Sequence, residues 1–130
     1  MQEKIMVVDD DPDILDALTM ILESKGYQVI TARDGIEALT KLEAEKPDLM
    51  ILDLLMPKMD GFAVYKELQD TKWSKHRDIP ILILTSIREE ASRRRYELET
   101  GAELDIEDYV EKPFPPDILL ERVGRLIKKE

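Results

Sequence analysis

The feature that most constrains the fold is a short apolar run, residues 49–52 (Leu-Met-Ile-Leu), that ends at the carboxylate of Asp53. Apolar residues without a polar break predict a strand that is buried on both faces. Pro57 and Gly61 follow and prevent the chain from continuing as a regular strand or helix. Ligands of open α/β sheets bind beside the carboxyl ends of the strands, so Asp53 is a candidate site residue, although one aspartate at a strand end is more often only structural.

The rest of the chain alternates between strand-like and helix-like segments. Further short strands are predicted over residues 4–8, 27–32, 79–84 and 108–110. Apolar residues at helical spacing predict helices that follow Asp11, Gly35, Gly61, Arg88 and Pro115. Such alternation predicts an α/β fold with a parallel sheet covered on both faces. With right-handed crossovers, we predict a flavodoxin-like, doubly wound sheet of five strands in the order 2-1-3-4-5, with five helices.

Two aspartates stand close to predicted helix starts. Asp11 before Pro12 predicts an N-cap with proline at the first helical position, and Gly26 predicts the end of that helix. Asp34-Gly35 predicts a turn between the second strand and the second helix. These assignments leave the two aspartates directly before Asp11 without a structural role.

Length and composition exclude several classes of protein. A chain of 130 residues predicts a single domain. The chain has neither an apolar run of membrane-spanning length nor a signal-peptide pattern, so we expect a cytoplasmic protein without a membrane segment. The absence of cysteine excludes disulfides and thiolate metal sites. A net charge of −10 argues against direct nucleic-acid binding, because the acidic field repels the phosphate backbone.

Polar residues gather where the predicted strands end: Asp9 and Asp10, then Asp53, Thr85 and Lys112. The carboxyl ends of parallel strands share one edge of a sheet, and three carboxylates there are costly unless a cation joins them. Oxygen ligands favour Mg²⁺ or Mn²⁺ over zinc. Lys112 and Thr85 can bind phosphoryl oxygens, which leaves Asp53 as a nucleophile that forms an aspartyl phosphate. Taken singly, Lys112 could form an ordinary salt bridge and Thr85 could simply end a strand; together the set favours a site.

Four ordered motifs carry a family resemblance: Val7-Val8-Asp9-Asp10-Asp11-Pro12, Asp53-Leu54-Leu55-Met56-Pro57-Lys58-Met59-Asp60-Gly61, Thr85-Ser86 and Lys112-Pro113-Phe114. Together they resemble the CheY-like receiver domain of two-component response regulators. The resemblance covers essentially the whole chain, so we expect residues 1–130 to be one receiver domain, with no effector domain among them. It implies a phosphoprotein that acts as a signalling switch and is not a conventional enzyme.

The resemblance implies a role for each residue of the site. Asp53 would accept a phosphoryl group from the phosphohistidine of a sensor histidine kinase or of a phosphotransfer protein. Mg²⁺, with Mn²⁺ as a substitute, would be held by Asp10, by Asp53, by the backbone carbonyl of Leu55 and, largely through water, by Asp9. Lys112 would bind the phosphoryl group.

The resemblance also implies how the signal leaves the site. Thr85 would move inward on phosphorylation, and the ring of Tyr109 would turn toward the pocket that Thr85 vacates. A cis peptide is implied between Lys112 and Pro113. The fourth helix, fifth strand and fifth helix would form the output face. A downstream protein partner, or an effector domain outside this sequence, would recognise that face, and phosphorylation could make the domain dimerise.

Two departures from the family pattern affect these expectations. Extra residues over 103–107 lie on the implied output face, so the geometry of the partner or of the dimer cannot simply be carried over. Leu55 and Ile87 are apolar where polar residues would help to place a hydrolytic water. We therefore predict a long-lived phosphate, with at most slow autophosphatase activity.

Two other functions remain open. A pseudo-receiver would bind partners without phosphorylation, which the intact Asp10, Asp53, Thr85 and Lys112 make less expected. A Mg²⁺-dependent aspartyl-phosphate phosphohydrolase usually carries a second acid two residues after its nucleophile, and Leu55 stands there instead. Turnover of phosphomonoesters would separate that enzyme from a switch.

Overall fold

The computed structural model describes residues 3–53, 64, 66–67, 79–85, 108–111 and 115–128, and of residues 85, 108, 109, 111 and 128 it describes the backbone alone. The strands are β1 (Lys4–Val8), β2 (Gln28–Ala32), β3 (Leu49–Asp53), β4 (Ile81–Thr85) and β5 (Asp108–Glu111). The helices are α1 (Pro12–Glu23), α2 (Gly35–Glu45) and α5 (Pro116–Lys128). None of these described helices is long and apolar enough to cross a lipid bilayer.

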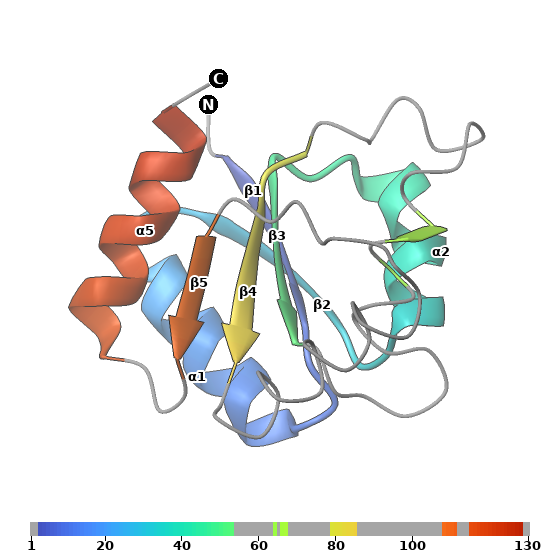
Figure 1. Ribbon diagram of the computed structural model, residues 1–130, viewed down its shortest axis with the longest axis horizontal. Coiled ribbons are helices and arrows are strands. Elements are labelled where there is room, and N and C mark those ends of the chain that lie inside the picture. The colour runs from blue at the N-terminus through green and yellow to red at the C-terminus, as the bar shows by residue number, and fades with distance from the viewer. Residues whose placement is uncertain are drawn as a thin grey trace, which may run out of the picture.

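The strands form one five-stranded sheet in the order β2-β1-β3-β4-β5, which confirms the predicted topology (Figure 1). Every neighbouring pair is parallel. β3 lies at the centre, and all five of its residues are buried, as the unbroken apolar run predicted. Since all strands point the same way, their carboxyl ends lie along a single edge of the sheet.

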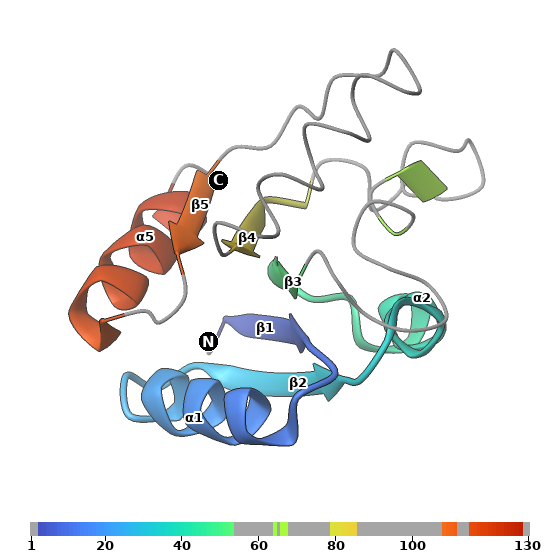
Figure 2. The ribbon, with the colours of Figure 1, turned by 60° about the horizontal axis from the view of Figure 1, so that its bottom comes forward.

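Helices cover both faces of this sheet, with α1 and α5 on one face and α2 on the other (Figure 2). Successive residues of a strand point to opposite faces, so each inner strand contributes to two apolar layers. On the α1 and α5 side, Val7 and Ile51 pack with Leu18 and Val123. On the α2 side, Val8 and Leu52 pack with Leu42. The two layers explain why the inner strands show no alternation of polar and apolar residues.

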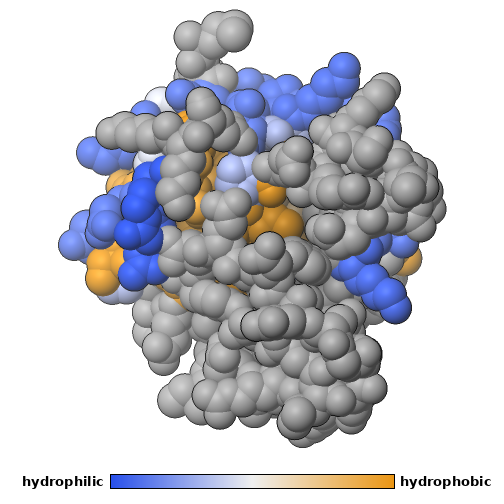
Figure 3. Space-filling model, turned by 45° about the horizontal axis from the view of Figure 1, so that its top comes forward, coloured by the Kyte–Doolittle hydropathy of each residue, from blue (hydrophilic) through white to orange (hydrophobic). Residues whose placement is uncertain are grey.

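Hydrophilic side chains make up most of the described surface that one face of the molecule shows (Figure 3). On the face drawn in Figure 3, hydrophilic side chains predominate among the described residues at the rim, whereas apolar side chains gather toward the middle. Few large apolar side chains are exposed in the described part of the chain; they are Met20, Ile36 and Ile118.

The ends of α1 are those predicted from the sequence. The side chain of Asp11 accepts a hydrogen bond from the Asp13 amide at 2.9 Å, and Pro12 is the first helical residue. After the last residue, Glu23, the chain turns through Gly26, whose φ of 86° is a left-handed conformation that glycine adopts without strain.

The turn predicted at Asp34-Gly35 between the second strand and the second helix is a bend at residues 33–34 that leads directly into α2, which starts one residue earlier than predicted. Asp34 is the N-cap of α2, its side chain accepts from the Glu37 amide at 2.8 Å, and Gly35 is already helical. Asx turns and N-caps use the same side-chain-to-backbone hydrogen bond, which is why the dipeptide could not separate them. The helix ends at Glu45, with Lys46 in the left-handed conformation directly before Pro47.

Strand bounds differ from the prediction by one or two residues. β2 begins at Gln28 and β4 at Ile81. The carbonyl of Pro80 accepts from the Met50 amide at 3.0 Å, but Pro80 has no amide hydrogen to donate, and regular pairing starts only at the next residue. β5 continues through Glu111, which pairs with Thr85 of β4.

Several predicted elements fall outside the described residues. Val64, Lys66 and Glu67 are helical, in agreement with the helix predicted after Gly61. The helix predicted over residues 89–100 and the extra residues 103–107 lie outside the described ranges.

Candidate functional site

Three carboxylates meet where β1 and β3 end. Asp9 and Asp10 directly follow β1, and Asp53 is the last residue of β3. Val8 pairs with Leu52 in the parallel ladder, so the chain places the next residue of each strand side by side. Carboxylate oxygens of the three aspartates lie within 4.8 Å of one another.

The surroundings of the three aspartates differ. Asp9 and Asp53 are 1% and 2% exposed, whereas Asp10 is exposed to solvent. Both the backbone and the side chain of Asp9 are hydrogen-bonded. Its amide donates to the Ala32 carbonyl at 3.1 Å, and its Oδ1 accepts from the Asp11 amide at 3.0 Å. The cluster therefore has a buried, fixed side and a solvent-facing side.

This donor set fits a divalent cation. Carboxylates this close repel one another, and the repulsion is strongest for the buried pair Asp9 and Asp53, because little water screens it. A cation removes that repulsion. Among the described residues, three carboxylates stand together with no nitrogen or sulfur ligand beside them, which suits a hard ion such as Mg²⁺ or Mn²⁺. The exposed Asp10 leaves room for the water that Mg²⁺ keeps.

The structure places only part of the remaining predicted site. Thr85 is the last residue of β4, beside β3, so its backbone lies at the same edge of the sheet as Asp53. Tyr109 lies in β5, opposite Ile83. The side chains of Thr85 and Tyr109 are not among those described. Leu55, Ile87, Lys112 and the peptide between Lys112 and Pro113 also lie outside the described residues.

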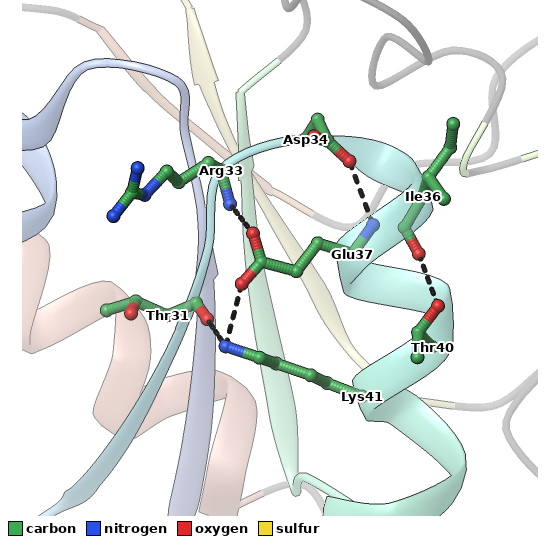
Figure 4. A network of polar contacts seen from close by, with 7 residues as sticks. All are labelled: Thr31, Arg33, Asp34, Ile36, Glu37, Thr40 and Lys41. Atoms are coloured by element: carbon green, nitrogen blue, oxygen red, sulfur yellow. Dashed lines mark hydrogen bonds and ion pairs between the residues drawn. The ribbon is translucent and has the colours of Figure 1, made fainter.

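Sequence reasoning missed a polar network at the start of α2 (Figure 4). The Arg33 amide donates to Glu37 Oε1 at 3.0 Å, and Lys41 Nζ contacts Glu37 Oε2 at 2.8 Å. Lys41 Nζ also donates to the Thr31 carbonyl at 2.6 Å. The hydrogen bond from Lys41, followed by that from the Arg33 amide, lowers the pKa of Glu37 below its ordinary value. The spacing of Asp34, Glu37 and Lys41, typical of a capping box followed by an (i, i+4) ion pair, was the available signal.

Comparison with known proteins agrees with this architecture. The family model described as "Response regulator receiver domain" matches residues 5–124. A curated relative, the alkaline phosphatase synthesis transcriptional regulatory protein PhoP of Bacillus subtilis, is 44% identical over 99% of this chain and 50% of its own length. The response regulator MprA of Mycobacterium bovis is 39% identical over 99% of this chain and 52% of its own length. The chain thus spans about half the length of the curated relatives it matches.

Solved structures give the same result. The chemotaxis response regulator CheY4 of Vibrio cholerae is 31% identical, with a TM-score of 0.81 over 97% of this chain and 99% of that chain. The receiver domain of the Francisella response regulator 1452 is 30% identical, with a TM-score of 0.78 over 98% of each chain. The chain, with its acidic cluster at the carboxyl edge of a five-stranded parallel sheet, belongs to the receiver domain family of two-component response regulators.

Proposed function

We propose that Asp53 is the phosphoacceptor of this receiver domain and that Asp9 and Asp10 complete a Mg²⁺ site beside it. The observation that carries the proposal is the cluster of three carboxylates within 4.8 Å at the carboxyl edge of the sheet. Asp53 stands at the end of the central strand, 2% exposed, where a reacting carboxylate is held by the core behind it.

The proposed reaction is transfer of one phosphoryl group. A carboxylate oxygen of Asp53 attacks phosphorus, the bond to the histidine nitrogen of the donor breaks, and the imidazole leaves with that electron pair. The product is an aspartyl phosphate, a mixed anhydride. The donor is a sensor histidine kinase or a phosphotransfer protein.

Asp9, Asp10, Asp53 and the backbone carbonyl of Leu55 would hold Mg²⁺, or Mn²⁺ in its place. The ion supplies positive charge beside the phosphoryl oxygens. Asp9 is fixed by the hydrogen bonds of its amide and Oδ1, so it offers a preset oxygen on the buried side of the site. Lys112 would add a second positive charge against the phosphoryl group.

The proposed output path runs through the last two strands. Thr85 and Tyr109 lie in β4 and β5, which are hydrogen-bonded neighbours, so a shift of the Thr85 backbone would displace the paired residues of β5. We propose that Thr85 moves toward the phosphate and that Tyr109 follows, which changes the face of the fourth helix, β5 and α5. A cytoplasmic protein partner, an effector domain or a second receiver would bind that face.

The phosphate is proposed to be long-lived, because Leu55 and Ile87 offer no group that orients a hydrolytic water. The protein would then be a switch with at most slow autophosphatase activity. Loss of the phosphate within seconds in Mg²⁺ buffer would contradict this part of the proposal.

The test is the intact mass of the protein after incubation with acetyl phosphate and Mg²⁺. We expect one phosphoryl adduct on the wild type and none on Asp53→Ala or in the presence of EDTA. Asp16→Ala is the matched control, since it removes an exposed carboxylate of α1 and should keep the adduct. Absence of an adduct from the wild type would overturn the proposal and favour a pseudo-receiver. Sustained turnover of phosphomonoesters would favour a phosphohydrolase.

A further inference from the structure

The network at the start of α2 lies beside the outer side of β2, which we call the open edge of the sheet. β2 is the terminal strand, with β1 on one side and no described strand on the other. Backbone groups of an edge strand that face outward lack a partner strand. In a parallel strand, successive residues direct their carbonyls to opposite sides. The Ala32 carbonyl faces β1, where it accepts from Asp9, so the Thr31 carbonyl faces the open edge, where Lys41 Nζ donates to it.

Two contacts from α2 therefore enclose a single residue of β2. Lys41 holds the carbonyl of Thr31, before Ala32, and Glu37 holds the amide of Arg33, after it. The two side chains are joined to each other by their own 2.8 Å ion pair (Figure 4). The end of the edge strand is thus fixed by a helix at the place where a partner strand would otherwise fix it.

Ala32 is the residue that connects this network to the acidic cluster. It is fully buried, and its carbonyl accepts the Asp9 amide at 3.1 Å. Asp9 in turn accepts from the Asp11 amide through Oδ1. A displacement of Ala32 would move the backbone of Asp9, and with it a carboxylate of the cluster.

We propose that Glu37 and Lys41 are positioning residues of the cation site: by holding both sides of Ala32, they keep Asp9 in place among the three carboxylates. The inference rests on the proposed function, in which Asp9 helps to hold the ion. Glu37 and Lys41 touch neither the ion nor the phosphoryl group in this account. They act through the backbone.

The position of the pair predicts a local effect without a large loss of stability. The side chains of Lys41 and Glu37 are 38% and 36% exposed, and ion pairs that are this accessible to solvent contribute little to global stability. Loss of the pair should instead loosen the end of β2. Groups that orient a metal ligand directly often change affinity 10- to 100-fold, so we expect a more distant pair to change it about 3- to 10-fold.

The test compares Lys41→Met with Lys4→Met. Lys4 is the matched control because its Nζ, like that of Lys41, both donates to a backbone carbonyl and pairs with a glutamate, although for Lys4 both groups belong to Glu45, the last residue of α2 (carbonyl at 2.9 Å). Lys4, however, is the first residue of β1 and lies at the amino end of the strand, whereas the aspartates lie at the carboxyl ends of the strands. Two readouts are needed: the dissociation constant for Mg²⁺ by calorimetry, and hydrogen exchange of the Asp9 amide by NMR.

We expect Lys41→Met to bind Mg²⁺ about 3- to 10-fold more weakly and to lose protection of the Asp9 amide, and Lys4→Met to change neither. Both variants remove one positive charge, which by long-range attraction alone would strengthen binding of a cation. Weaker binding by Lys41→Met is therefore opposite in sign to the effect of net charge. Lys41→Arg should restore most of the affinity, since it keeps a cationic donor.

Equal behaviour of Lys41→Met and Lys4→Met in both readouts would overturn the inference, as would unchanged protection of Asp9 in Lys41→Met. A wild type that binds no Mg²⁺ would overturn the proposed cation site itself. In that case the Asp9 amide still decides whether Lys41 positions this residue, so the two failures are distinguishable.

Discussion

Replacing Asp53 by asparagine should stabilise the metal-free fold, although it removes the proposed phosphoacceptor. At the 4.8 Å limit, two unit charges repel by about 3.5 kcal/mol in a medium of effective dielectric constant about 20. Asn has nearly the same volume as Asp and carries no charge. Water screens the exposed Asp10, and Asn cannot reproduce every contact of the carboxylate. We therefore expect a net gain of about 2 kcal/mol in the free energy of unfolding, most of it from the buried partner Asp9.

The assay is urea unfolding with EDTA and with saturating Mg²⁺. In EDTA, Asp53→Asn should raise the midpoint by roughly 1 M, from an m-value of about 1.5–2 kcal/mol/M for a domain of this size. Mg²⁺ at about 100 times its dissociation constant should stabilise the wild type by about 2.7 kcal/mol and the variant by much less. The variant should therefore be the more stable protein in EDTA, and this advantage over the wild type should disappear when the ion is present.

Asp16→Asn provides the control, since it makes the same chemical change on the exposed face of α1. It should shift neither the midpoint nor the response to Mg²⁺. The electrostatic reasoning is refuted if Asp53→Asn is less stable than the wild type in EDTA, or if Asp53→Asn responds to Mg²⁺ as strongly as the wild type does.

Three further predictions concern the elements that support the site. Leu18→Ala removes a fully buried side chain of α1 and should cost about 3 kcal/mol in urea unfolding, whereas Met20→Ala, at a position 73% exposed, should cost little. Asp34→Ala removes the N-cap of α2 and should cost about 1 kcal/mol; a negligible change would contradict the cap. Glu37 has a lowered pKa in the folded state, so its contribution to stability is complete above its ordinary pKa of 4.5 and is lost as the pH falls through the lowered value. As the pH falls below 4.5, the wild type should therefore lose more stability than Glu37→Gln, and parallel curves would contradict this.

The elements that could be predicted from the sequence are those that depend on local pattern. The apolar run before Asp53 predicted a central strand because only a strand covered on both faces can bury every residue. Asp11 and Pro12 predicted the start of α1 because a cap and a missing amide hydrogen act within one helical turn. The topology followed from alternation of strands and helices, which also brought the residues after β1 and at the end of β3 to one edge.

Other features depended on contacts between segments. The sequence could not show that Asp9 and Asp53 are buried while Asp10 is exposed, because burial depends on what packs over each side chain. Asp34 could make either a turn or a cap, and the hydrogen bond to Glu37 decided for the cap. Local pattern is ambiguous in such cases because one side-chain motif satisfies the backbone in more than one conformation.

The sequence by itself determined the family, the strand order and the convergence of three aspartates at one edge, because these follow from short-range periodicity and the geometry of parallel sheets. Only the tertiary structure showed that Lys41, on a helix, reaches the Thr31 carbonyl of the edge strand, and that Ala32 carries this contact to Asp9. That link depends on how α2 lies against the open edge of β2, which no spacing of residues along the chain specifies.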